Sequence, residues 1–117
     1  MKKAFLIFAI ATGVFAGEFD GTYSTKKGDI KVMQFEGIVN FMLLSVGSGS
    51  MSSACDVSGS AVMQSKTAAL FQRASDTGGC AILFDFSQSG KLLVKSKGCQ
   101  MFCTDRSGFD GEYKKTK

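Results

Sequence analysis

Four cysteines, at positions 55, 80, 99 and 103, are the residues of this chain best suited to carry chemistry. A four-thiolate zinc site is the disfavoured alternative, because the spacing lacks two short Cys-x2-Cys knuckles and the sequence contains no histidine. A redox function would favour a Cys-x2-Cys at a helix start, whereas three residues separate Cys99 from Cys103. Four cysteines in a short chain are typical of two structural disulfides when the chain is exported, which its N-terminal residues predict.

The pairing of these cysteines has three possible solutions. We expect Cys55 to pair with Cys80, since both lie at the starts of predicted strands. We expect Cys99 to pair with Cys103 across a glycine-led turn, where a local bridge can close.

Acid–base and nucleophilic catalysis have little support in the sequence. The Ser–His and Cys–His arrangements need a histidine, which is absent. The ten carboxylates are scattered, and most fall at turns or at outward strand positions, where solvation explains them. We therefore expect no enzyme: no catalytic residue, no cofactor and no metal.

The first sixteen residues have the pattern of a signal peptide. Lys2 and Lys3 form a positive start, residues 4–14 are apolar, and small residues at 14 and 16 predict cleavage before Gly17. A buried N-terminal helix is the alternative, but an apolar run without a polar face does not suit a small domain. The run is also short for a membrane span, which needs about 20 residues. No cysteine follows the predicted cut, so no lipid anchor is expected there.

We predict a signal peptide at 1–16, a single domain at 17–117, and an unlipidated periplasmic protein without a membrane span after cleavage. Removing Lys2 and Lys3 from the 14 basic residues leaves 12 against 10 acidic ones, a net charge of +2. This charge is too small to indicate nucleic-acid binding. Three of the lysines lie in the last four residues, which we expect to be a frayed, solubilising end.

The elements that would position these residues are predicted to be strands. The chain has 14 glycines and no proline, and its short apolar runs are separated by Gly, Ser and Asp breaks. The predicted strands are 21–25, 30–35, 38–46, 55–63, 67–72, 80–86, 91–95 and 109–114. About eight strands in about 100 residues suit an all-β fold, either a small closed barrel or a curled sheet, and we predict a small antiparallel barrel stapled by disulfides.

Two details of the pattern bear on how this barrel closes and packs. A Phe-Asp-Gly-x-Tyr pattern at residues 19–23 returns at 109–113, so we expect the first and last strands to meet. Gly59 and Ala61 are small members of an otherwise alternating strand, and we expect a bulky side chain to pack against them.

Residues 38–46 form the most apolar run of the predicted domain. Its length also permits a buried helix, but β-branched and aromatic residues, bounded by Gly37 and Gly47, favour a strand. A strand apolar on both faces favours a partner surface or a homodimer contact. The Ser- and Gly-rich residues 47–53 that follow are predicted to be a long hairpin connection.

A family resemblance rests on several of these motifs taken together. They are a Gly-x-Tyr at 21–23, residues 55–61, the alternation from Cys80 to Phe84, and a Gly-Cys-x3-Cys at 98–103 followed by the Phe-Asp-Gly-x-Tyr at 109–113. Over residues 21–115 the chain resembles exported lysozyme-inhibitor-like proteins of the LprI type and related periplasmic inhibitors of c-type lysozyme. The resemblance implies a Ser-Gly-rich loop that enters the active-site cleft of the lysozyme. The counterparts here are Ser48, Gly49, Ser50 and Met51, with Met51 near the position of an expected tyrosine.

These observations give a first functional hypothesis and two alternatives. The first is a periplasmic inhibitor of lysozyme or another peptidoglycan-cleaving enzyme, acting by loop insertion, with that hydrolase as its protein partner. The second is a barrel that binds a small apolar ligand among its phenylalanines. The third is a structural or adhesive envelope protein that packs against another subunit through residues 38–46.

Overall fold

The computed structural model describes residues 18–26, 28–46, 54–75, 78–103 and 109–117, and it confirms the all-β prediction. Eight antiparallel strands close into a barrel, each pairing with the next and the last with the first. A single 3₁₀ turn, η1 (Gln100–Phe102), interrupts the strands within the described residues. The strands are β1 (Gly21–Thr25), β2 (Gly28–Phe35), β3 (Ile38–Val46), β4 (Ala54–Met63), β5 (Ala68–Ser75), β6 (Gly78–Asp85), β7 (Lys91–Lys97) and β8 (Gly111–Lys115).

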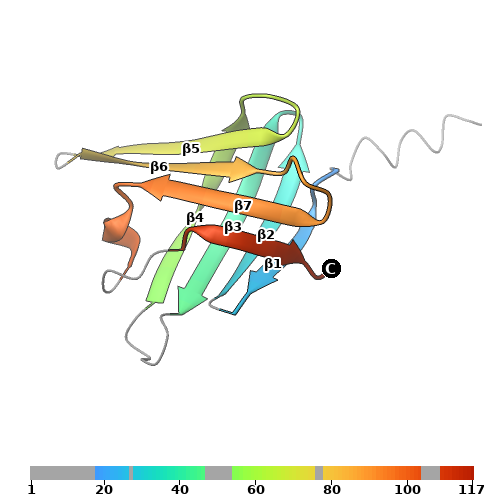
Figure 1. Cartoon of the computed structure of the whole chain (residues 1–117). Coiled ribbons are helices and arrows are strands. Elements are labelled where there is room, and N and C mark those ends of the chain that lie inside the picture. Colours follow the sequence, from blue (N-terminus) through green and yellow to red (C-terminus); the bar gives the residue numbers. More distant parts are fainter. Residues whose placement is uncertain (1–17, 27, 47–53, 76–77, 104–108) are drawn as a thin grey trace, which may run out of the picture.

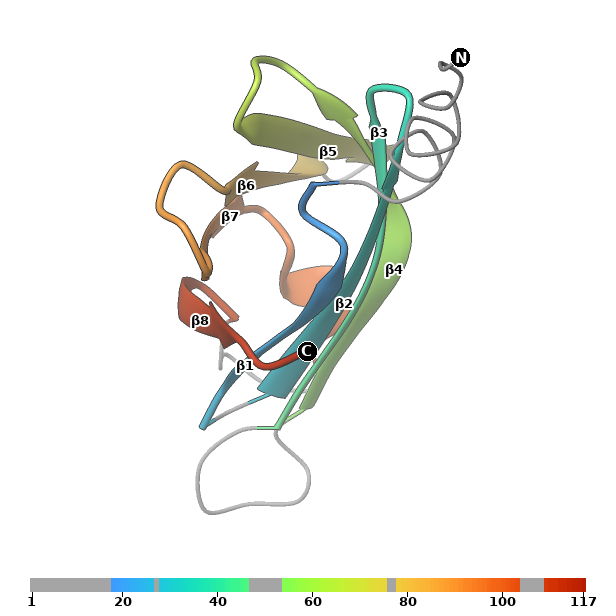
Figure 2. The same ribbon diagram turned by 90° about the vertical axis from the view of Figure 1, so that its right-hand side faces the viewer.

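The barrel has two sides whose strands cross at a steep angle (Figure 1). One side contains β1 to β4 and the other β5 to β8. Figure 2 shows the barrel turned by 90°, with β1 and β8 side by side where the barrel closes. The sides join at two seams. At one, β4 pairs with β5 through only two residue pairs, and at the other, β1 pairs with β8 through two. The second seam confirms that the first and last strands meet.

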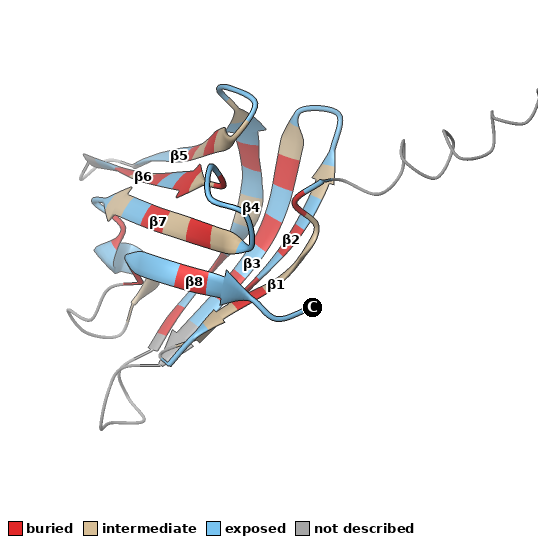
Figure 3. Cartoon of the chain, turned by 45° about the vertical axis from the view of Figure 1, so that its right-hand side comes forward, coloured by how far each residue is buried: buried red, intermediate tan, exposed pale blue. Residues whose placement is uncertain are grey.

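The interior is filled by the inward residues of every strand, which alternate with exposed ones (Figure 3). In β3, Val39, Phe41 and Leu43 are buried, while Met42 and Leu44 face outward. This alternation confirms the strand reading of residues 38–46 and excludes the helical alternative. Phe41 packs against two further rings, edge-on to Phe71 at 5.2 Å and tilted against Phe84 at 4.7 Å between centroids.

Gly59 of β4 has a bulky neighbour, as its size predicts. A Cβ atom at this position would lie 2.6 Å from Cε1 of Phe71, closer than carbon atoms pack. Ala61, two residues along the same face, is completely buried. The small residues of β4 thus leave room for an aromatic ring from β5.

The strand boundaries differ from the predicted ones by up to three residues. β2 begins at Gly28, two residues earlier than predicted, and β5 extends to Ser75, three residues further. The last strand, β8, begins at Gly111, two residues later than predicted, because Phe109 and Asp110 lie outside the ladder between β7 and β8. Pairing with a neighbouring strand, which composition does not reveal, sets these ends.

The C-terminal lysines are not a frayed end. Lys114 and Lys115 belong to β8, and the backbone continues to pair with β1 beyond it. The amide of Thr22 donates to the carbonyl of Lys117 at 3.1 Å, and the amide of Thr116 donates to the carbonyl of Thr22 at 2.8 Å. The expectation was wrong because a charged tail sequence does not show that the neighbouring strand offers it free backbone partners.

Two disulfides are present, but both predicted pairings are wrong. Cys55 bonds to Cys103 and Cys80 bonds to Cys99. Cys55 lies in β4 and Cys80 in β6, with β5 between them, so they cannot meet. Cys80 and Cys99 instead lie near the paired ends of the neighbouring strands β6 and β7, where Ala81 is opposite Lys97.

The short turn η1 explains the second error. It separates Cys99 from Cys103 and carries Cys103 to an isolated antiparallel bridge with Cys55. Sequence separations of 48 and 19 residues correspond to about 4 and 3 kcal/mol of loop-closure stabilisation on the chain-entropy model. The two disulfides anchor η1 at both of its ends, because Cys99 is bonded to Cys80 in β6 and Cys103 is bonded to Cys55 in β4.

Candidate binding surface at the disulfide end of the barrel

The residues predicted to contact a partner, Ser48, Gly49, Ser50 and Met51, lie outside the described part of the chain, as does the predicted signal peptide at 1–16. The structure therefore describes only what flanks the predicted loop. β3 ends at Val46 and β4 begins at Ala54, and the next residue, Cys55, is held by its disulfide to Cys103.

A hollow of about 750 Å³ lies at the end of the barrel that the disulfides fix. Its wall combines the end of β5, the start of β6, the end of β7 and the turn η1. The lining residues are Gln72, Arg73, Ala74, Gly79, Cys80, Ala81, Lys97, Gly98, Gln100 and Met101. Two of them are cations and two are amides, and this lining set contains no carboxylate.

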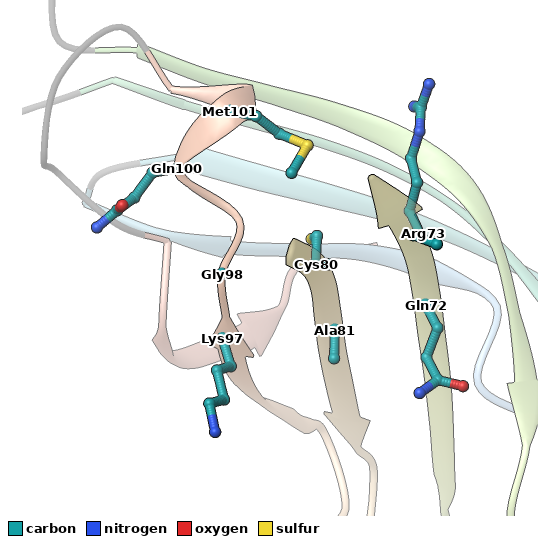
Figure 4. Close-up of a pocket in the computed structure, with 10 residues that line it drawn as sticks. Gln72, Arg73, Cys80, Ala81, Lys97, Gly98, Gln100 and Met101 are labelled. Atoms are coloured by element: carbon teal, nitrogen blue, oxygen red, sulfur yellow. The ribbon is translucent and has the colours of Figure 1, made fainter. Parts of the chain in front are cut away.

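The polar side chains of the hollow spread over its rim and do not converge on one point (Figure 4). Arg73 and Gln72 project in opposite directions from β5, and Lys97 projects from β7 in the same direction as Gln72. Met101 reaches from η1 toward Cys80. Met101 is 49% exposed, although it is a large apolar residue. This arrangement suits contact with an extended surface that carries negative charge better than capture of a small anion.

Local contacts hold the walls of the hollow in place. The guanidinium of Arg73 lies over the ring of Phe102 at 5.6 Å from its centroid, a cation–π contact that ties β5 to η1. Gly98 has a positive φ of 74°, and a Cβ there would overlap the carbonyl oxygen of Gly79. β6 and η1 therefore approach each other closely, and the Cys80–Cys99 disulfide covers the same junction.

The opposite end of the barrel has a smaller hollow of about 390 Å³. Its aromatic wall contains Phe19 stacked on Phe86 at 4.4 Å between centroids, with Tyr23 edge-on to Phe86 at 5.9 Å. Burial, assisted by the charge of Asp20, raises the pKa of Tyr23. Nearby, hydrogen bonds from Ser87 lower the pKa of Asp85.

The described residues hold no cluster of three or more histidine, cysteine or carboxylate side chains placed to bind a metal ion. All four cysteines are bonded in the two disulfides. Among residues 18–26, 28–46, 54–75, 78–103 and 109–117, no helix is long and apolar enough to cross a membrane.

The sequence reasoning missed the polar residues of the larger hollow. One signal was available for Arg73, which follows Ala69 and Phe71 at the inward positions of β5 and is nevertheless charged. A charge at an inward position indicates that the strand has run past the core. Lys97 and Gln100 gave no comparable signal, because they come together only through the turn after β7.

The chain matches no protein-family model, no curated protein and no solved structure.

Proposed function

We propose that this chain is an exported, non-catalytic binding protein that inhibits a lysozyme-like, peptidoglycan-cleaving hydrolase. The observation that carries the proposal is the rim of the larger hollow, with its two cations, two amides and no carboxylate on a disulfide-fixed barrel end. The resemblance to lysozyme inhibitors named above points to the same class of partner.

The chemistry of the target supports this choice of surface. Most glycoside hydrolases place two carboxyl groups on either side of the bond that they cleave, so their clefts are acidic at the centre. Arg73 and Lys97 supply positive charge, and Gln72 and Gln100 can donate hydrogen bonds to carboxylate oxygens. A wall already fixed by two disulfides loses little conformational freedom when it binds, which favours affinity.

Inhibition is tested by following the clearing of bacterial cell walls by several types of lysozyme, with and without the purified chain. We expect at least one type to be slowed at micromolar excess of the chain. A double variant, Arg73→Ala with Lys97→Ala, should weaken that inhibition at least about tenfold. The matched control is Lys114→Ala, which removes an exposed cation from β8. The proposal fails if no lysozyme is slowed, and its assignment to this hollow fails if the double variant inhibits as well as the control.

A second candidate function is supported by the aromatic hollow at the other end of the barrel. Its volume of about 390 Å³ falls within the range of small-molecule sites, and Phe19, Tyr23 and Phe86 would favour a flat apolar ligand. The two functions differ in their readout. A ligand at this end would change the tyrosine fluorescence and raise the unfolding temperature without affecting any hydrolase.

A further inference from the structure

The barrel closes only partly between β4 and β5, which leaves one edge of β5 open. The ladder between these two strands consists of two residue pairs and ends at Leu70 of β5. From there β4 turns away from β5 at a steep angle (Figure 1). On its other edge, β5 pairs with β6 without interruption as far as Ser75. Within the described part of the chain, residues 71–75 therefore have a strand on one side only, and we call their open side the β5 edge.

Two hydrogen bonds near the start of β5 show which backbone groups face the β5 edge. The carbonyl of Thr67 accepts from the amide of the residue after β6 at 2.7 Å, so it faces β6. The carbonyl of Ala68 accepts from the amide of the residue after β4 at 2.7 Å, so it faces the opposite edge. Backbone groups of successive residues alternate between the two edges of a strand. The N–H and C=O groups of Gln72 and Ala74 therefore point to the β5 edge, where no described residue pairs with them.

The facing edge of β4 is more covered than the β5 edge. Its start is occupied by the bridge between Cys55 and Cys103, and farther along the ring of Phe71 lies against Gly59. The β5 edge, by contrast, has exposed side chains at all three positions 72–74. Its two pairs of donors and acceptors are spaced about 6.8 Å apart, the repeat of an extended backbone. A peptide segment that adds as a further strand is the ligand that satisfies such an edge.

The side chain of Arg73 decides which segment fits the β5 edge. Its guanidinium is exposed and lies over the ring of Phe102. The ion pair found among the described residues joins Lys91 to Glu112, so Arg73 has no carboxylate partner there. An added strand places one side chain about 5 Å from Arg73 on the same face. A neutral side chain at that position would cover the guanidinium without pairing it, which is unfavourable, whereas a carboxylate would pair with it.

We propose that the β5 edge binds an extended segment of a partner protein, which adds as an antiparallel strand with an acidic residue opposite Arg73. The antiparallel direction is that of the two ladders β5 already makes, with β4 and with β6. The segment exchanges two backbone hydrogen bonds with Gln72 and two with Ala74. These residues also line the larger hollow, but the inference does not depend on the partner being a hydrolase.

The test is amide hydrogen exchange, measured by NMR on the chain with both disulfides formed, with and without the end-blocked peptide Thr-Val-Asp-Val-Thr. In the free chain, the amides of Gln72 and Ala74 should exchange faster than the amide of Arg73, which faces β6. Four backbone hydrogen bonds predict a dissociation constant on the order of 1 mM for so short a peptide. At ten times that concentration, exchange at Gln72 and Ala74 should slow about tenfold, because about one chain in eleven remains free.

Two modified peptides test whether the peptide adds as a strand. The N–H groups of both valines face the β5 edge in the proposed register, and that of the aspartate faces away. Methylation of the two valine nitrogens should therefore abolish binding, and methylation of the aspartate nitrogen should leave it. Equal binding of the two methylated peptides overturns the proposal. So does equal protection of Gln72, Arg73 and Ala74 in the free chain, which would show that the edge is not open.

A charge reversal tests the selection of an acidic segment. Arg73→Glu should weaken binding of the peptide at least about tenfold. The matched control is Lys114→Glu, which makes the same change in charge at an exposed position of β8 and should bind like the unmodified chain. A thermal melt of each variant checks that the barrel is intact. Equal weakening by both variants overturns the assignment to Arg73. Protection of Gln72 and Ala74 that grows with the concentration of the chain alone, together with a doubled mass, would overturn the proposal in favour of a second copy. A chain that slows no lysozyme but binds the peptide would refute only the inhibition proposed above.

Discussion

Replacing Gly59 with alanine should destabilise the barrel, although the same change at an open strand position would stabilise it. The φ angle of Gly59 is not among the positive ones, so alanine can adopt the backbone conformation. Gly→Ala at a compatible site usually adds about 0.4–1 kcal/mol by restricting the unfolded chain. At Gly59 the new Cβ would lie 2.6 Å from Cε1 and 3.2 Å from Cδ1 of Phe71.

The magnitude follows from how far the ring of Phe71 has to move. Carbon atoms pack at about 3.5–4.0 Å, so the ring must retreat by roughly 1 Å. Phe71 is only 8% exposed and packs edge-on against Phe41 at 5.2 Å, so the shift displaces a second ring. Overpacking of this kind costs about 1–3 kcal/mol. After the gain from restricting the unfolded chain is subtracted, we expect the free energy of unfolding to fall by about 1–2 kcal/mol. For a domain of this length, that corresponds to a decrease in Tm of about 5–15 °C.

The assay is reversible thermal or urea unfolding of Gly59→Ala, Phe71→Leu and the double variant. Shortening the ring should relieve the clash, so the double variant should be more stable than the sum of the single effects implies, with a coupling of at least about 0.5 kcal/mol. Ser58→Ala, an outward neighbour, is the control and should stay within about 0.5 kcal/mol of the unmodified chain. A Gly59→Ala variant that melts at a higher temperature, or strict additivity with Phe71→Leu, would refute the packing described here.

Three further outcomes are expected. Replacing Cys80 and Cys99 together by alanine should cost about 3 kcal/mol because a 19-residue loop is released, and peptide mapping without reduction should recover the Cys80–Cys99 pair; recovery of the bridge between Cys99 and Cys103 would contradict the structure. Burial, together with the charge of Asp110, raises the pKa of Tyr113 to about 12. The folded pKa of Tyr113 lies above the unfolded value of about 10. The stability that the neutral hydroxyl contributes to the folded chain is therefore complete below about pH 10 and is lost as the pH rises toward about 12. Urea unfolding of the unmodified chain and of Tyr113→Phe between about pH 9 and 12 would measure this loss. Truncation after residue 115 removes the backbone partners of Thr22 and should speed amide exchange in β1 while β3 is unaffected; unchanged exchange in β1 would show that the tail does not hold the seam.

The fold was predictable because alternation is a local property of the sequence. In β3 the inward Val39, Phe41 and Leu43 are separated by outward residues, and the same period of two marks β4 and β6. The turns carry their own signals in Gly, Ser and Asp. The number of strands, the closed barrel and the meeting of first and last strands therefore followed from patterns within the chain.

The disulfide pairing and the larger hollow were not predictable for a common reason. Both depend on which strand ends lie side by side after the barrel closes. Cys103 is four residues from Cys99 in sequence, but the turn η1 carries it to Cys55 on the other side of the barrel end. Arg73 and Lys97 likewise share one hollow only because β5, β6 and β7 are neighbours there.

The repeated Phe-Asp-Gly-x-Tyr pattern has a structural explanation in the seam where the barrel closes. In both copies the tyrosine hydroxyl donates to the carbonyl of the phenylalanine four residues earlier, Tyr23 to Phe19 at 2.9 Å and Tyr113 to Phe109 at 2.6 Å. The glycine between them has a φ near 150°, which favours glycine and sets the bend into the strand.

The aspartate of each copy binds the neighbouring hairpin strand. A carboxylate oxygen of Asp20 accepts from the backbone amide of Gln34 in β2 at 2.6 Å, and a carboxylate oxygen of Asp110 accepts from the hydroxyl of Ser96 in β7. Each terminal strand is thus tied to its own hairpin partner, β1 to β2 and β8 to β7. Because β1 and β8 share only two residue pairs, the seam would be weak if it depended on its own ladder. The pattern occurs twice because a barrel closed by its two terminal strands needs both of them held from outside the seam.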